Sequence, residues 1–217
     1  IWPSYRAFNA IIDAVINAGW EPDSIKKLVI THGHKDHTGC GKQFIEKYNV
    51  ETYLSETDDN FWEINTIKPY CPETGKDFYI TVYVKDGDTI TLGNKTIYVY
   101  DTPGHTPGCL SYIFPVTENE RVYMAALWGG ATPPRTVNGC IQYLKSLDYF
   151  MEKAYDKKVE VALSNHTSVD NGLERIIYSK ARMAYMPNIY IIGEEGFRKY
   201  CQAFRNMSYD VLEELLK

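Results

Sequence analysis

The sequence predicts an α/β protein in which two β-sheets pack together with helices outside them, a four-layer sandwich. Short apolar segments are followed by polar loops and helical patterns near residues 27–48 and again near residues 159–185. The middle of the chain alternates apolar and polar residues, which is typical of strands. We find no linker and no low-complexity stretch, so we expect residues 1–217 to form a single domain.

A helix is the first predicted element, opened by Pro3 and Ser4 and closed by Gly19. Its apolar residues recur at helical spacing and are Phe8, Ile11, Ile12, Val15 and Ile16. The apolar run 27–30 then predicts a buried strand, and the glycine-broken run 38–41 predicts a loop that leads into a helix.

Between that strand and that helix lies the segment that carries the chemistry, Thr31-His32-Gly33-His34-Lys35-Asp36-His37. It holds three of the five histidines, so the alternative of a polar surface loop explains it poorly. Imidazole nitrogen and carboxylate oxygen are ligands that zinc accepts. If strand geometry continues through the loop, His32 and His34 face one ion while Asp36 and His37 turn toward a second.

Further elements are predicted in chain order. In the first half we expect a helix over 42–48, a strand over 50–54, a helix over 56–64, a loop over 67–76, and consecutive antiparallel strands over 78–100 with turns at 86–88 and 93–94. In the second half we expect strands over 111–116 and 122–127, a helix over 141–155, a strand over 159–163, and helices over 173–185 and 195–215.

The two remaining histidines each follow a predicted strand. His105 sits in a loop fixed by Pro103, Gly104, Pro107 and Gly108, which suits a preorganised ligand. A lone loop histidine is more often a surface residue, but after the histidine-rich segment His105 becomes the expected third ligand. His166 follows the strand 159–163 and is the best candidate to complete a second site.

Composition narrows the function classes. The net charge is −5, with 23 basic and 28 acidic residues and no long basic run, which disfavours nucleic acid as a partner. No apolar run reaches membrane-spanning length. Five widely spaced cysteines indicate mostly buried free thiols, although one disulfide remains an alternative. The chain starts at Ile1, so its localisation stays open between export and the cytoplasm.

From about Asp13 onward the chain resembles the metallo-β-lactamase superfamily of metallohydrolases. The matching segments are 31–37, then Thr102-Pro103-Gly104-His105-Thr106-Pro107-Gly108, then Leu163-Ser164-Asn165-His166. The resemblance implies an αββα sandwich with two zinc ions per chain between the sheets. It also implies that the first zinc is held by His32, His34 and His105 and the second by Asp36, His37 and His166.

Two departures from the family pattern are informative. Many members place a bridging aspartate, and others a cysteine, where this chain has Leu127-Trp128-Gly129-Gly130. The resulting ligand set is most similar to the third metallo-β-lactamase subclass, and it weighs against thioesterase, lactonase and nuclease activities. Only about thirty residues precede the histidines, so we expect the N-terminal strands to be missing, which leaves a sheet edge open to homo-oligomer formation.

These observations predict a zinc-dependent hydrolase in which a metal-bound hydroxide cleaves an amide or ester bond of a small-molecule substrate, in the manner of a β-lactamase. Asp36 is expected to orient the hydroxide. Trp128, Thr132 and Asn138 are candidate substrate contacts, with the alternative that Trp128 is a core residue. The competing hypotheses are a hydrolase of a non-lactam ester, thioester or lactone, and a non-catalytic scaffold.

Overall fold

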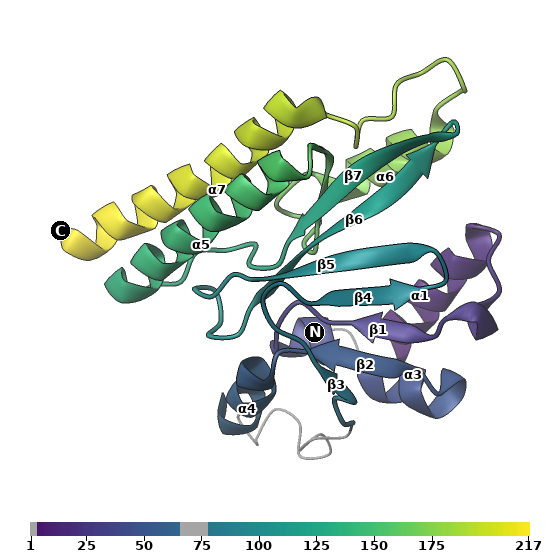
Figure 1. Ribbon diagram of the computed structural model, residues 1–217, viewed down its shortest axis with the longest axis horizontal. Coiled ribbons are helices and arrows are strands. Elements are labelled where there is room, and N and C mark those ends of the chain that lie inside the picture. Colours follow the sequence, from purple (N-terminus) through teal and green to yellow (C-terminus); the bar gives the residue numbers. More distant parts are fainter. Residues whose placement is uncertain (1–3, 66–77) are drawn as a thin grey trace. The chain divides into compact units, whose positions relative to one another are not determined.

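A computed structural model describes residues 4–65 and 78–217 and shows a mixed α/β protein (Figure 1). The chain divides into two compact units, an N-terminal unit (Ile1–Val84) and a C-terminal unit (Lys85–Lys217). Each unit contains one sheet and its own helices, which confirms the predicted fold class. That all 217 residues form a single domain stays a prediction. The expected loop over 67–76 lies outside the described residues.

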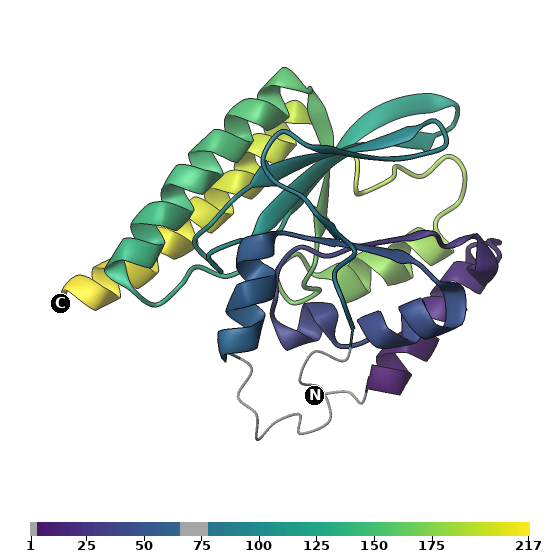
Figure 2. The same ribbon diagram turned by 60° about the horizontal axis from the view of Figure 1, so that its bottom comes forward.

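The N-terminal unit is built on a small parallel sheet with strand order β1-β2-β3. Its elements are α1 (Ser4–Asn17), a 3-10 turn (Pro22–Ser24), β1 (Lys27–Val29), α2 (Lys35–Thr38), α3 (Gly41–Tyr48), β2 (Glu51–Leu54), α4 (Glu56–Asn65) and β3 (Val82–Tyr83). Figure 2 shows α1 and α3, in purple and dark blue, side by side in this unit.

Apolar residues of the first helix form the core of this unit only in part. Phe8 and Ile12 are buried, and the Phe8 ring lies 5.0 Å from the Phe44 ring of α3, centroid to centroid. Ile11 and Ile16 are 42% and 54% exposed. The apolar stripe that faces the core is therefore narrower than the sequence pattern predicts.

The prediction of consecutive antiparallel strands from residue 78 onward is wrong for its first part. Only β3 is a strand there, and it pairs parallel with β2 in the N-terminal sheet. Two threonines explain this pairing. The hydroxyl of Thr81 accepts the main-chain N–H of Thr52 at 2.8 Å, and the hydroxyl of Thr52 accepts that of Thr81 at 2.9 Å. These bonds attach the segment to β2, a contact that a pattern read along the chain does not reveal.

The C-terminal unit is built on a five-stranded sheet with order β4-β5-β6-β7-β8. Its elements are β4 (Thr89–Leu92), β5 (Lys95–Asp101), β6 (Leu110–Glu118), β7 (Arg121–Trp128), α5 (Val137–Asp156), β8 (Val159–Ser164), α6 (Gly172–Ala181) and α7 (Gly193–Leu216). Strands β4 to β7 are antiparallel neighbours and β8 runs parallel to β7. Helix α6 is shorter than predicted because the backbone is extended at Arg182.

The core of the C-terminal unit lies between the sheet and the paired helices α5 and α7 (Figure 1). Trp128, Tyr143, Phe150 and Phe204 are its largest buried side chains. The described cysteines are free thiols, as predicted, and are Cys40, Cys109, Cys140 and Cys201, whereas Cys71 lies outside the described residues. In the described part of the chain, every helix is too short or too polar to cross a bilayer.

Candidate metal centre

The histidine-rich segment occupies the turn between β1 and α2 in the N-terminal unit. The strand ends at Val29, and the N–H of Ile30 donates to the carbonyl of Tyr53 at 2.9 Å, so pairing with β2 continues for one residue. His32 is fully buried and His34 caps the short helix that carries Asp36 and His37. The candidate metal-donor side chains thus come from a loop and a helical turn. The strand geometry expected from the sequence ends at Val29 and does not continue through them.

The imidazoles of this segment lie in direct contact. The His32 ring centroid lies 4.0 Å from that of His37 and 4.9 Å from that of His34. Nε2 of His37 lies 3.4 Å from a carboxylate oxygen of Asp36. This donor chemistry, nitrogen with one carboxylate oxygen, suits zinc.

A buried carboxylate anchors the same turn. Asp58 on α4 is fully buried, and its Oδ2 accepts the main-chain N–H of Gly33 at 2.8 Å. The N–H of Asp58 donates to the hydroxyl of Ser55, which precedes α4, at 3.1 Å. Asp58 was not among the residues predicted from the sequence. The Ser55-x-x-Asp58 spacing was the available signal, because serine three residues before an acidic residue is typical of a helix N-terminus.

In the C-terminal unit, His105 lies on the loop between β5 and β6. Its Nδ1 lies 2.7 Å from the carbonyl oxygen of Thr132. A carbonyl only accepts hydrogen bonds, so Nδ1 carries the proton and Nε2 becomes the nitrogen able to bind a metal. The preceding Gly104 has φ +141°, and a Cβ there would lie 2.6 Å from the Tyr143 main chain. The loop therefore requires glycine at this position.

The end of β7 leaves no room for an additional ligand. A Cβ on Gly129 would lie 1.9 Å from the carbonyl oxygen of Leu110, and one on Gly130 would lie 2.7 Å from the Cβ of His105. An aspartate or cysteine at either position would require the surrounding backbone to move. Neither Gly129 nor Gly130 can therefore be replaced by a bridging ligand while this backbone is kept.

Trp128 belongs to the core of the C-terminal unit, which is the alternative left open by the sequence. Its side chain is 1% exposed, and its indole N–H donates to the hydroxyl of Tyr143 at 2.9 Å. Burial raises the pKa of Tyr143 far above its usual value. The protonated hydroxyl donates in turn to the carbonyl of Gly130 at 2.7 Å. Trp128 therefore supports the backbone beside His105 and is not available for substrate.

His166 follows β8 and is held by its neighbours. Its N–H donates to the hydroxyl of Ser164 at 3.1 Å, and that hydroxyl donates to the carbonyl of His166 at 3.0 Å. The amide of Asn165 donates to the carbonyl of Gly129 at 2.8 Å. The ends of β7 and β8 are thereby joined directly, so the backbones beside both histidines of this unit are connected.

The other two candidate substrate contacts are exposed. Thr132 lies in the loop after β7 and engages His105 through its main chain, and Asn138 lies in the first turn of α5. Their contact with a substrate stays a prediction. The binding of shared ions by His32, His34 and His105, and by Asp36, His37 and His166, also stays a prediction.

A family model described as the Metallo-beta-lactamase superfamily matches residues 6–118, more than half of the 217-residue chain. Two curated relatives are hydroxyacylglutathione hydrolases. That of Crocosphaera subtropica is 33% identical over 93 residues, which cover 42% of this chain and 30% of that protein. That of Klebsiella pneumoniae is 29% identical over 102 residues, which cover 47% and 33%. The chain spans about a third of the length of these relatives.

Solved structures resemble nearly the whole chain. The subclass B3 metallo-beta-lactamase BJP-1 of Bradyrhizobium japonicum is 23% identical, with a TM-score of 0.76 over 97% of this chain and 81% of that one. The metallo-beta-lactamase FEZ-1 of Legionella gormanii is 17% identical, with a TM-score of 0.77 over 95% and 81%. At these identities the likeness establishes a shared fold.

Proposed function

The chain belongs to the metallo-beta-lactamase superfamily, and we propose that it is a hydrolase that uses two zinc ions to cleave an amide or ester bond. The first ion is held by His32, His34 and His105, and the second by Asp36, His37 and His166.

The observation that carries the proposal is the contact among His32, His34 and His37, with the Asp36 carboxylate beside them. Imidazole nitrogens gathered beside a carboxylate oxygen are the donor set that zinc prefers. A divalent cation held among them would compensate the cost of removing these polar groups from water. Three ligands per ion would also leave positions open for water and substrate, as in catalytic zinc sites.

Support in the C-terminal unit comes from how His105 and His166 are fixed. The Thr132 carbonyl sets the tautomer of His105, and Ser164 holds the main chain of His166. Orientation of this kind is what ligand histidines require. The crowded backbone at Gly129 and Gly130 supports a ligand set without a bridging carboxylate.

When bound, the ions would acidify a coordinated water and polarise the carbonyl of the substrate. We propose that Asp36 orients the attacking water by accepting a hydrogen bond from it, because its carboxylate has a second oxygen besides the one near His37. Thr132 and Asn138 are the proposed polar contacts to a small-molecule substrate. No serine or cysteine nucleophile is needed.

Two substrate classes follow from different observations. The absence of a bridging ligand, together with the fold shared with subclass B3 metallo-beta-lactamases, favours a cyclic amide. The sequence similarity to proteins named hydroxyacylglutathione hydrolases favours a hydroxyacyl thioester of glutathione as the second candidate. We place the cyclic amide first because the structural likeness covers 97% of the chain, whereas the sequence match to the first of those relatives covers 42%.

Hydrolysis assays on the full chain test this proposal. A set of chromogenic lactams and a set of hydroxyacylglutathiones are assayed with added zinc, with a chelator, and with zinc restored. We expect lactam turnover that the chelator abolishes and zinc restores. Chelator-sensitive turnover of the glutathione thioesters alone would favour the second substrate class, the hydroxyacylglutathiones. Zinc binding without turnover of either set would contradict both.

Elemental analysis addresses the non-catalytic alternative. A hydrolase of the proposed kind holds close to two zinc ions per chain, whereas a decayed scaffold holds none. The net charge of −5 is consistent with the proposed absence of a nucleic-acid partner. Self-association through a sheet edge, and the absence of a membrane partner, stay predictions.

A further inference from the structure

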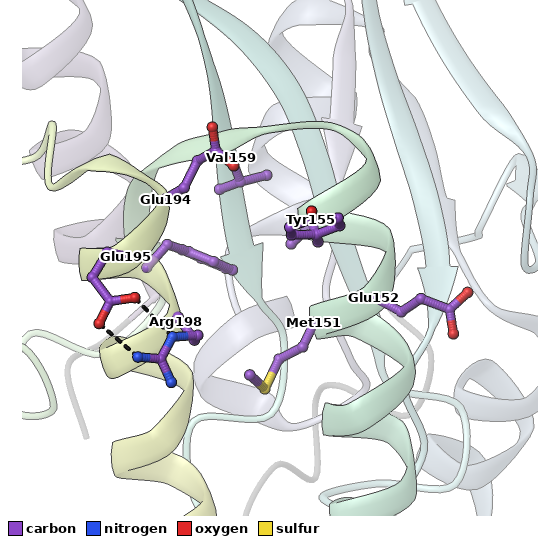
Figure 3. Close-up of a pocket in the computed structure, with 9 residues that line it drawn as sticks. Met151, Glu152, Tyr155, Val159, Glu194, Glu195 and Arg198 are labelled. Atoms are coloured by element: carbon purple, nitrogen blue, oxygen red, sulfur yellow. Dashed lines mark hydrogen bonds and ion pairs between the residues drawn. The ribbon is translucent and has the colours of Figure 1, made fainter.

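A cavity lies in the C-terminal unit, away from the histidines of that unit. It has a volume of about 480 Å³ and is bounded by the last turns of α5, the first residue of β8 and the first turns of α7 (Figure 3). Val159 begins β8, and His166 follows the other end of that strand. About 20 Å of extended chain separates the two residues. The cavity therefore has no part in the proposed metal centre.

Its deepest surface is apolar. Ala154, Val159 and Phe197 are each at most 5% exposed and contribute to the lining, and Met151 adds a flexible thioether from α5. A volume of this size and a mainly apolar wall are typical of sites for small organic molecules. The floor fits an aliphatic or aromatic body of the ligand.

One carboxylate at the rim has no ion pair. Arg198 donates two hydrogen bonds to the carboxylate of Glu195, at 2.8 and 2.6 Å, and Lys199 lies 3.8 Å from the same carboxylate. The carboxylate of Glu152 points away from the cavity (Figure 3). Among the described residues, no cation forms an ion pair with Glu194, which also lines the cavity. The rim thus offers one carboxylate without a cationic partner.

An aromatic ring lies on the opposite wall of the cavity. Tyr155 on α5 is 77% exposed, and Figure 3 shows Tyr155 and Glu194 on the two sides of the opening. A carboxylate and the face of an aromatic ring both attract an ammonium group. Together with the apolar floor they define a ligand that has a hydrocarbon body and a positive end.

We propose that this cavity binds an apolar amine, with the hydrocarbon part on Val159 and Phe197 and the ammonium group between Glu194 and Tyr155. The site is additional to the proposed hydrolytic centre. It needs no metal, so binding is testable in protein that has been stripped of zinc.

Titration of isotope-labelled full chain with 4-phenylbutylamine, followed by amide NMR shifts, tests the proposal. We expect saturable shifts at Ala154, Val159 and Phe197. The uncharged analogue 4-phenylbutanol is expected to bind about fivefold more weakly, which is the effect of one partly exposed ion pair. The anionic 4-phenylbutanoate should bind more weakly still.

Two exposed residues provide variants that should fold normally. Glu194→Gln should remove the preference for the amine over the alcohol, and Tyr155→Ala should weaken the binding of the amine about threefold. Glu213→Gln, an exposed glutamate near the other end of α7, is the matched control and should change nothing. Absence of saturable shifts at the cavity, equal binding of amine and alcohol, or the same response from the Glu194 and Glu213 variants would overturn the proposal.

Discussion

The two units of the chain position their histidines in different ways. In the N-terminal unit, His32, His34 and His37 come from one turn, and their mutual contact follows from their proximity in the chain. In the C-terminal unit, His105 and His166 stand alone, and residues distant in the sequence hold their loops. The positions of ligands in a contiguous motif are thus set largely by local backbone structure, whereas the position of an isolated ligand depends on tertiary contacts.

The largest expected effect tests the dependence on a single isolated ligand. His105→Ala should lower kcat/KM for the best substrate at least about a hundredfold, because losing a direct ligand costs more than disturbing its hydrogen-bond partner. Thr132→Ala is the matched comparison. It removes a hydroxyl that lies 3.3 Å from Nδ1 of His105 and is a proposed substrate contact, but it keeps the main-chain carbonyl that holds His105. This variant should therefore keep its zinc and lose far less activity than His105→Ala. A His105→Ala enzyme within tenfold of the wild type would remove His105 from the site.

Tertiary support of His105 is tested by Gly130→Ala. The added Cβ would lie 2.7 Å from the Cβ of His105, which is closer than two such carbons pack. Overpacking of this kind costs about 1–3 kcal/mol, so the urea midpoint should fall and zinc affinity should fall with it. Unchanged stability together with unchanged zinc affinity would show that the loop tolerates displacement. It would contradict the inference that His105 depends on tertiary structure for its position.

The anchor of the contiguous turn is tested by Asp58→Ala. Removing the carboxylate leaves the buried N–H of Gly33 without its acceptor, which costs about 1–3 kcal/mol. Asp58→Asn keeps an oxygen able to accept that bond and should cost less. Amide hydrogen exchange should show Gly33 losing protection, while Gly104 in the other unit keeps its own. Equal loss of protection at Gly33 and Gly104 would contradict the inference that separate contacts hold the two segments.

The smallest expected effect is a pH dependence confined to the N-terminal unit. The hydroxyl of Tyr83 donates to the carboxylate of Asp59 at 2.7 Å, and this bond raises the pKa of Tyr83 to about 12. The raised pKa favours the protonated form in the folded state. Its contribution to stability is thus complete below pH 10 and is lost as the pH rises toward 12. The slope of the urea midpoint over this range should be shallower in both Tyr83→Phe and Asp59→Asn, and an unchanged slope would contradict the assignment.

Much of the molecule was predictable from the sequence because its patterns are local. The α/β class, the helices α3, α5 and α7, and the antiparallel strands β4 to β7 agree with periodicity and turn residues. The pairing of β3 with β2 was not predictable, because it depends on hydroxyls of Thr52 and Thr81 that lie far apart in the chain.

The candidate site shows the same limit. The ligand motif is visible in the sequence, and His105 and His166 stood out because few histidines remain. Asp58 was missed because the Ser55-x-x-Asp58 spacing indicates a helix N-terminus and not a contact with Gly33. The carbonyl of Thr132 was missed because a main-chain oxygen leaves no signal in the sequence. The core position of Trp128 also required the structure.

The central proposal is that His34 and His105 bind the same ion, and a zinc-stoichiometry cycle tests it most directly. Zinc per chain is measured for the wild type, for His34→Ala, for His105→Ala and for the double variant, after equilibration with a competing chelator. The account predicts two ions in the wild type and one in each of the three variants, because both histidines belong to one site. A double variant that loses both ions while each single variant loses one would show that the histidines bind different ions and would contradict the account.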